Sequence, residues 1–197
     1  RGALEIGAPV KEAVLSEQLG ISRAPIREAL QVLVQEGLIT SEPQKGKHVR
    51  QMTGKEIYDS YVVAGTLEGA GVAESLPLWT EANMETFRSV VRQMEGKISY
   101  ATKLDELAEI DELFHATLFM ACDNTRLVEM ARTSCATISK SLYYQHWITM
   151  FTPREYADRH HAVAEAVYSR DVKHVETALR DHYKETGLRM AQFGKEA

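Results

Sequence analysis

Two ionisable side chains interrupt an apolar helical face between residues 104 and 118. Asp111 and His115 share that face because residues three, four and seven positions apart lie on one side of a helix. Burying such groups is costly unless a partner satisfies them. An aspartate and a histidine four residues apart can bind one metal ion, or they can simply hydrogen-bond to each other. The apolar members of this face are Leu104, Leu107, Phe114 and Leu118.

Two more histidines occupy inward positions of predicted helices. His160 shares a face with Val163, Ala164 and Val167, and its neighbour His161 does not. His182 continues a face formed by Val172, Val175 and Leu179. One such histidine is usually a satisfied core residue, but two of them beside an inward Asp/His pair favour a shared site. Three imidazoles and one carboxylate suit a divalent transition metal such as Zn²⁺, Ni²⁺ or Mn²⁺. The predicted ligands are Asp111, His115, His160 and His182.

A second group of chemically informative residues lies near the N-terminus. Arg23 and Arg27 are four residues apart, at the start of a helix predicted over 23–37. Arginine is the commonest reader of guanine when a recognition helix enters the major groove. The preceding segment, 10–20, is also predicted to be helical and ends at Gly20, and Ser22 is a suitable N-cap. Two helices joined by so short a turn indicate a helix-turn-helix.

A β-hairpin is predicted directly after these helices. Residues 38–40 and 48–50 have strand character, and the segment between them is rich in turn-forming residues. Such a hairpin after the second helix forms a wing. Its tip, Lys45-Gly46-Lys47, is suited to contact phosphates or the minor groove.

Composition narrows the possible classes of protein. The chain has 197 residues, of which 44% are hydrophobic, and a net charge of −5. Residues 1–50 hold seven basic and six acidic side chains, so the N-terminal part is less acidic than the remainder. Neither a signal peptide nor an apolar run of membrane-spanning length is visible. Cys122 and Cys135 are expected to be thiols. We therefore expect a soluble, cytoplasmic protein with no membrane partner.

The remainder of the chain is predicted to be a bundle of six or seven helices. Thr53-Gly54-Lys55 is a plausible domain boundary. Gly65, Gly69 and Gly71 weaken the first helix of the bundle and suggest close helix packing. The fold class expected is mainly α, with an N-terminal winged helix-turn-helix and a C-terminal all-α bundle. The six helices that can be placed span 55–75, 80–97, 104–118, 124–147, 152–169 and 171–190.

The stretch LSEQLGISRAPIREALQVLVQEGLI, followed by the Lys-Gly-Lys wing, resembles the DNA-binding domain of the GntR superfamily of bacterial transcription regulators over about residues 9–50. The resemblance implies that Ser22, Arg23 and Arg27 touch the operator, with Gly46 and its neighbours contacting DNA from the wing. Family members usually carry a further helix before this point. Here Arg1-Gly2-Ala3-Leu4 looks like its end, so we expect the first helix of the domain to be missing from this sequence.

The Asp111/His115 pair, Arg159-His160-His161 and His182 resemble the metal-binding pattern of the FCD (FadR/VanR-like) subfamily. This resemblance implies that one Asp and three His hold a metal in a pocket, where a small organic acid commonly completes the coordination. Many relatives carry an arginine shortly before the glutamate that is Glu68 here, whereas this chain has Ala64. Any effector contact made by that arginine cannot be transferred.

The leading hypothesis is therefore a homodimeric transcription regulator and not an enzyme. Residues 1–52 would bind operator DNA, and residues 55–197 would bind the metal and a carboxylate effector and form the dimer. A metal-dependent hydrolase is an alternative, because such a metal could activate water, but no nucleophile motif is present. A purely structural metal in a dimerisation domain is the third possibility. Additional pocket candidates are Tyr61, Tyr143, Tyr144 and His146.

Overall fold

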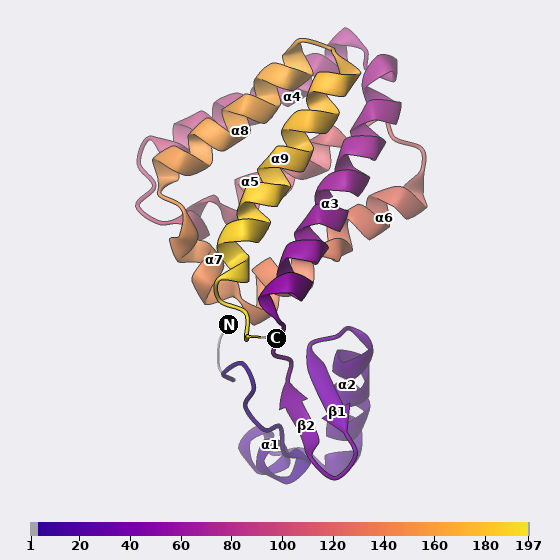
Figure 1. Ribbon diagram of the computed structural model, residues 1–197, viewed down its shortest axis with the longest axis vertical. Coiled ribbons are helices and arrows are strands. Elements are labelled where there is room, and N and C mark those ends of the chain that lie inside the picture. The colour runs from indigo at the N-terminus through magenta and orange to yellow at the C-terminus, as the bar shows by residue number, and fades with distance from the viewer. Residues whose placement is uncertain (1–3, 197) are drawn as a thin grey trace.

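A computed structural model describes residues 4–196, apart from the side chains at 139 and 140. A small winged part lies below a larger helical bundle, and the chain segment 50–54 joins them (Figure 1). Residues 1–3, expected to belong to the end of a further helix, lie outside the described residues. The mainly α fold, with a winged helix-turn-helix and an all-α bundle, is confirmed.

The winged part packs around a small core of its own. That core consists of Val10, Ile26, Leu30 and Ile39. Helix α2 supplies Ile26 and Leu30 from one face, so the opposite face is open to solvent. The elements of this part are α1 (Glu12–Leu19), α2 (Arg23–Gln35), β1 (Ile39–Glu42) and β2 (Gly46–Val49).

Helix α1 is short and has no fully buried residue, and its Val14 and Leu19 side chains are 45% and 63% exposed. The strands extend further into the wing than the predicted 38–40 and 48–50, since antiparallel pairing continues to Glu42 opposite Gly46. The chain can reverse so tightly because Gly46 adopts a φ of 84°, which glycine tolerates.

The bundle is organised on the antiparallel pair α3 and α9 (Figure 1). Helix α6 packs on α3, α8 packs on α9, and α4 packs against α5 and α8. Its main core contains Phe87, Phe114, Leu118, Val163 and Leu179. Among the described residues, no helix is long and apolar enough to cross a membrane. The helices are α3 (Gly54–Ser75), α4 (Glu81–Ile98), α5 (Ala108–Leu118), α6 (Thr125–Ser134), α7 (Tyr144–Met150), α8 (Pro153–Tyr168) and α9 (Val172–Ala191).

Two of the predicted helices are interrupted. The first turn of the 104–118 segment is a 3₁₀ helix over Leu104–Leu107. The continuous helix expected over 124–147 is wrong: α6 ends at Ser134, a π-helical turn covers Ile138–Leu142, and α7 then starts. The hydroxyls of Thr133 and Ser134 bond back to the carbonyls of Glu129 and Met130. Such side-chain bonds compete with regular helix formation, and they occur where α6 ends.

The glycines of α3 allow its close contact with α9. A Cβ atom added to Gly65 would lie 2.8 Å from Cβ of Tyr183 and 3.3 Å from the carbonyl oxygen of Leu179. A Cβ added to Gly187 on α9 would lie 2.8 Å from Cβ of Tyr61. The expectation that glycine serves close packing here is consistent with these distances.

We expect Gly65→Ala to lower the free energy of unfolding by about 1–2 kcal/mol, because overpacking outweighs the helix-propensity gain of alanine. Gly96→Ala is the matched control: nothing lies within 4 Å of a Cβ at that exposed position of α4. It should raise stability by up to about 1 kcal/mol. Urea denaturation of both variants measures this, and equal stabilisation by the two substitutions would contradict the packing argument.

Candidate metal centre and DNA-binding face

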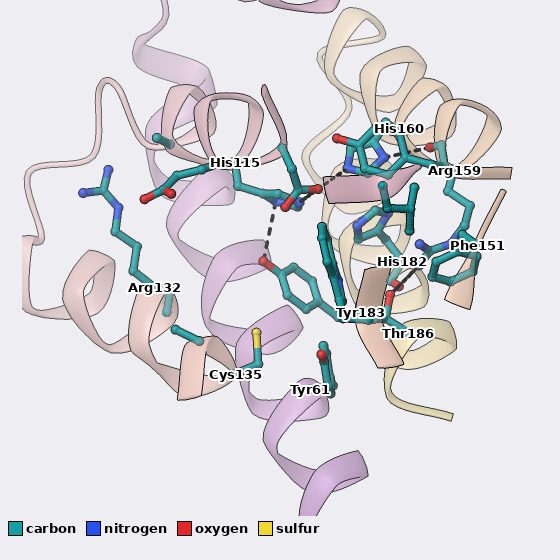
Figure 2. A pocket seen from close by; sticks show the side chains of 18 residues that line it. Tyr61, His115, Arg132, Cys135, Phe151, Arg159, His160, His182, Tyr183 and Thr186 are labelled. Atoms are coloured by element: carbon teal, nitrogen blue, oxygen red, sulfur yellow. Dashed lines mark hydrogen bonds and ion pairs between the residues drawn. The ribbon is translucent and has the colours of Figure 1, made fainter. Parts of the chain in front are cut away.

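The three predicted histidine ligands converge from three helices. His115 of α5, His160 of α8 and His182 of α9 each offer a ring nitrogen, and these atoms all lie within 4.8 Å of one another. Figure 2 shows the three rings facing one cavity. His115 and His182 are 67 positions apart in the chain, so it is the packing of the helices in the bundle that brings the three histidines together.

Asp111 lies beside the same histidines. Its Oδ1 atom is 3.1 Å from Nε2 of His160 and 3.9 Å from Nε2 of His115. The structure thus brings together all four residues that the sequence singled out, and leaves out His161, which is half-exposed and 3.5 Å from Glu95.

Hydrogen bonds on the far side of two rings fix how they face Asp111. Nδ1 of His115 donates to Oε1 of Glu68 at 2.7 Å, and Nδ1 of His160 donates to the carbonyl oxygen of Tyr156 at 2.8 Å. Both partners are acceptors, so Nδ1 of each ring carries a proton, and Nε2 of each ring is directed inward. Ligating histidines in proteins are oriented in this way.

Burial and nearby charges set the protonation of the cluster. Burial opposes ionisation of Asp111, but the adjacent His160 imidazole and the positive charge of His115 keep its pKa below the usual value. Burial lowers the pKa of His160, and burial together with the charge of Arg159 lowers that of His182 further. For His115, burial is outweighed by the Glu68 carboxylate, which raises the pKa to about 9.

These groups fit a divalent metal ion. With His160 neutral, its Nε2 lone pair and the Asp111 carboxylate are two acceptors only 3.1 Å apart, which is unfavourable unless a cation or a proton lies with them. Nδ1 of His182 is buried and has no hydrogen-bond partner among the described residues. Unpaired buried polar atoms are rare, and a ligand commonly accounts for them. Nitrogen and carboxylate donors are those that Zn²⁺, Ni²⁺ and Mn²⁺ accept.

Glu68 was not predicted as a site residue. It is 2% exposed in α3, and its second carboxylate oxygen accepts a hydrogen bond of 2.5 Å from the hydroxyl of Tyr183. The available signal was that Glu68 is the one carboxylate in the stretch 60–73, which otherwise consists of small and apolar residues, Thr66 and Tyr61. Helical periodicity alone could not connect it with a histidine 47 residues later.

A cavity of about 310 Å³ opens beside the cluster. Arg159 forms part of its wall: the side chain is 12% exposed, stacks on Phe151 at 4.0 Å, and hydrogen-bonds to Glu185 and Thr186. Arg159, like Glu68, was not predicted from the sequence as a site residue. Of the four additional candidates, Tyr61 lines the cavity, while Tyr143, Tyr144 and His146 are not among its lining residues. Cys135 lines it as well, and no disulfide occurs in the described part of the chain.

Ion pairs connect three of the predicted DNA-contacting residues with neighbouring carboxylates. Arg27, on α2, and Lys47, on β2, both form ion pairs of 3.1 Å with Glu12. Lys45 at the wing tip pairs with Glu42 at 2.8 Å. Arg23, in the first turn of α2, is exposed and has no ion pair among residues 4–196.

Ser22 precedes α2 as its N-cap residue, but its side chain makes no capping hydrogen bond. Its hydroxyl is therefore not occupied by the helix end. Gly46 lies in the hairpin turn, and nothing lies within 4 Å of a Cβ atom placed there. Both residues are exposed.

Comparison with known proteins agrees with this architecture. The family model "Bacterial regulatory proteins, gntR family" matches residues 1–49, and the FCD domain model matches residues 59–185. The HTH-type transcriptional repressor RspR of Escherichia coli is 25% identical over 190 residues, covering 96% of this chain and 82% of that protein. The Nta operon transcriptional regulator of Aminobacter aminovorans is 28% identical over 156 residues, covering 78% and 70%.

Among solved structures, E. coli McbR/YncC superposes with a TM-score of 0.72 at 21% identity, covering 97% of this chain and 90% of that one. Fold and matches together define a DNA-binding transcription regulator rather than an enzyme. The chain belongs to the GntR family of bacterial regulatory proteins and carries an FCD domain.

Proposed function

We propose that this regulator senses a small carboxylate at a metal ion held by Asp111, His115, His160 and His182, and that the bound carboxylate changes its affinity for operator DNA. The main support for this proposal is that these four residues line a cavity whose wall also contains Arg159, a side chain that is only 12% exposed. A divalent ion there would offer open coordination positions to a carboxylate.

The chain's own residues would select and orient such a ligand. Arg159 places a positive charge in the cavity wall, held in place by Phe151 and by its hydrogen bonds to α9. Tyr61 and Trp147 contribute aromatic surface on other sides. A cavity of about 310 Å³ restricts the ligand to a small organic acid.

The experiment that tests this proposal is a thermal-shift screen of the metal-loaded protein against small carboxylates. A sensor should gain further stability from a subset of these acids, because a ligand that binds only the folded state raises its stability. If metal stabilises the protein and no carboxylate adds to that effect or alters DNA binding, the metal is structural and the sensor proposal fails.

The DNA-binding unit in this proposal is residues 1–52. Arg23 and Arg27 would read bases, while Ser22, Lys45, Gly46 and Lys47 would contact the backbone or minor groove. Residues 55–197 would bind metal and effector and form a homodimer. Two winged domains then meet half-sites about one helical turn apart, so a small change in their separation is enough to release DNA.

Contacts between the cavity wall and the interdomain segment offer a route for this change. The hydroxyl of Tyr143 accepts from the backbone N–H of Met52 at 3.0 Å and lies 3.3 Å from its carbonyl oxygen, which also accepts from N of Lys195 at 2.9 Å. Tyr143 directly follows the π-helical turn, which itself follows Cys135 of the cavity wall. One apolar cluster packs Met52, Tyr143 and Tyr61 together. A ligand that moves this wall would therefore move the segment that carries the winged part.

We expect Tyr143→Phe to weaken the effect of a carboxylate on DNA binding while leaving carboxylate binding itself unchanged, because only the link to Met52 is lost. Allosteric coupling of this kind is typically about 5- to 150-fold in affinity, and the variant should lose most of it. Fluorescence anisotropy of labelled DNA, with and without the carboxylate, measures the factor. Tyr100→Phe, at a side chain 69% exposed, is the control. Undiminished coupling in Tyr143→Phe would exclude this route.

A further inference from the structure

The carboxylate of Glu12 joins three elements of the winged part. Its Oε2 atom accepts hydrogen bonds from Nε and Nη2 of Arg27, both at 3.1 Å. Its Oε1 atom accepts one from Nζ of Lys47, also at 3.1 Å. Glu12 starts α1, so one side chain connects α1 with the recognition helix and with the wing. Glu12 and Lys47 are 22% and 23% exposed, whereas Arg27 is 60% exposed.

The atoms that Glu12 contacts leave one edge of Arg27 available. The carboxylate covers the side formed by Nε and one N–H of Nη2. No described residue accepts a hydrogen bond from Nη1, so the outer edge formed by Nη1 and Nη2 keeps its donors. Reading guanine requires two such donors directed at O6 and N7. A guanidinium already fixed in this orientation loses less side-chain freedom when it binds.

We propose that Glu12 is a positioning residue that presents Arg27 end-on to a base pair and thereby determines sequence specificity. The inference rests on the proposed DNA-reading role of Arg27. A carboxylate on a DNA-binding face opposes general attraction to phosphates, so a contribution from Glu12 has to come through orientation.

Glu12 is ionised at neutral pH, because hydrogen bonds from Arg27 and then Lys47 lower its pKa. Two observations favour positioning over a merely stabilising contact. The Arg27 end of its ion pair is 60% exposed, and exposed ion pairs contribute little to stability in general. The same carboxylate also ties Lys47 to the recognition helix, which fixes the wing relative to Arg27.

The test compares a duplex selected from random-sequence DNA by the wild-type protein with a scrambled duplex of equal length and composition. In Glu12→Gln, we expect binding to the selected duplex to weaken about fivefold and binding to the scrambled duplex to tighten. The released Arg27 and Lys47 become available to phosphates, so the slope of log affinity against log salt should steepen by about one for the scrambled duplex. Glu17→Gln, an equal charge change at an exposed position of α1, is the matched control and should affect both duplexes equally.

Several outcomes would overturn the inference. If Glu12→Gln weakens binding to both duplexes equally and lowers the melting temperature, Glu12 only stabilises the winged fold. If the substitution tightens binding to both duplexes equally, Glu12 acts only by repelling the DNA phosphates. The double variant Glu12→Gln/Arg27→Ala should have the same sequence specificity as Arg27→Ala alone. A further loss of specificity in the double variant would show that Glu12 does not act through Arg27. If Arg27→Ala keeps the full sequence preference, the proposed role of Arg27 fails as well. If Arg27→Ala loses preference and Glu12→Gln keeps it, only the present inference fails.

Discussion

His160→Ala is expected to abolish stoichiometric metal binding while leaving a folded winged domain. His160 is 1% exposed, presents Nε2 to Asp111 at 3.1 Å and is fixed through Nδ1 by Tyr156. Losing a partner of a ligating histidine typically costs about 10- to 100-fold in metal affinity, so losing the ligand itself should cost more. Native mass spectrometry, or metal analysis after dialysis, reports the stoichiometry.

His161→Ala provides the matched control one residue away. His161 is half-exposed and its nearest carboxylate is Glu95, so metal content should be unchanged. Asp111→Ala and His182→Ala should behave like His160→Ala. Unchanged stoichiometry in both of these variants would refute the four-ligand site.

Metal addition should also stabilise the wild-type protein and fail to stabilise His160→Ala. The stabilisation grows as RT ln(1 + [L]/Kd), which is about 4 kcal/mol at a metal concentration 1,000 times Kd. A thermal melt with and without metal therefore separates lost binding from simple damage to the core. Equal stabilisation of both proteins would place the metal elsewhere.

Arg27→Ala is expected to weaken specific DNA binding by roughly 1–3 kcal/mol, the range for a bidentate arginine–guanine contact. The Arg27 side chain is 60% exposed and is not among the buried residues of α2, so its loss should not disturb the core. Competition binding on a selected duplex and its single-base variants measures the loss and shows the position at which specificity relaxes.

Lys45→Ala and Arg88→Ala complete that comparison. Lys45 lies at the wing tip, and as a phosphate contact it should weaken all sequences alike and reduce the salt slope by about one. Arg88 is on α4 in the helical bundle, and its removal changes the charge without touching the winged part. An unaffected footprint in Arg27→Ala, or the same loss in Arg88→Ala, would contradict base reading by Arg27.

Local periodicity explains why the residues of the candidate metal site could be singled out from the sequence. Asp111 and His115 could be singled out because the helical repeat of 3.6 residues places them on an apolar face, where a buried polar group is costly unless a partner satisfies it. The same rule chose His160 over His161, and the structure places His160 in the cluster. Capping signals were equally local, and Thr152 begins α8 with a complete capping box.

What the sequence could not provide depends on contacts between distant segments. Glu68 meets His115 only because α3 packs beside α5 in the bundle, and Glu12 meets Arg27 and Lys47 only through the winged fold. The interruption after Ser134 also escaped prediction, because helical periodicity continues through residues whose hydroxyls bond back to the chain. In each of these cases, the polar side chain has a partner that is determined by the folded structure and not by its spacing in the sequence.

The most direct test of the central claim is the affinity for a selected DNA duplex, measured by fluorescence anisotropy with and without a carboxylate that stabilises the metal-loaded protein. We predict that the carboxylate changes this affinity at least about fivefold in the wild-type protein. The change should disappear after metal removal and in His160→Ala, and it should persist in His161→Ala. An equal response in His160→Ala, or no response of the wild-type protein to any stabilising carboxylate, would contradict metal-dependent sensing.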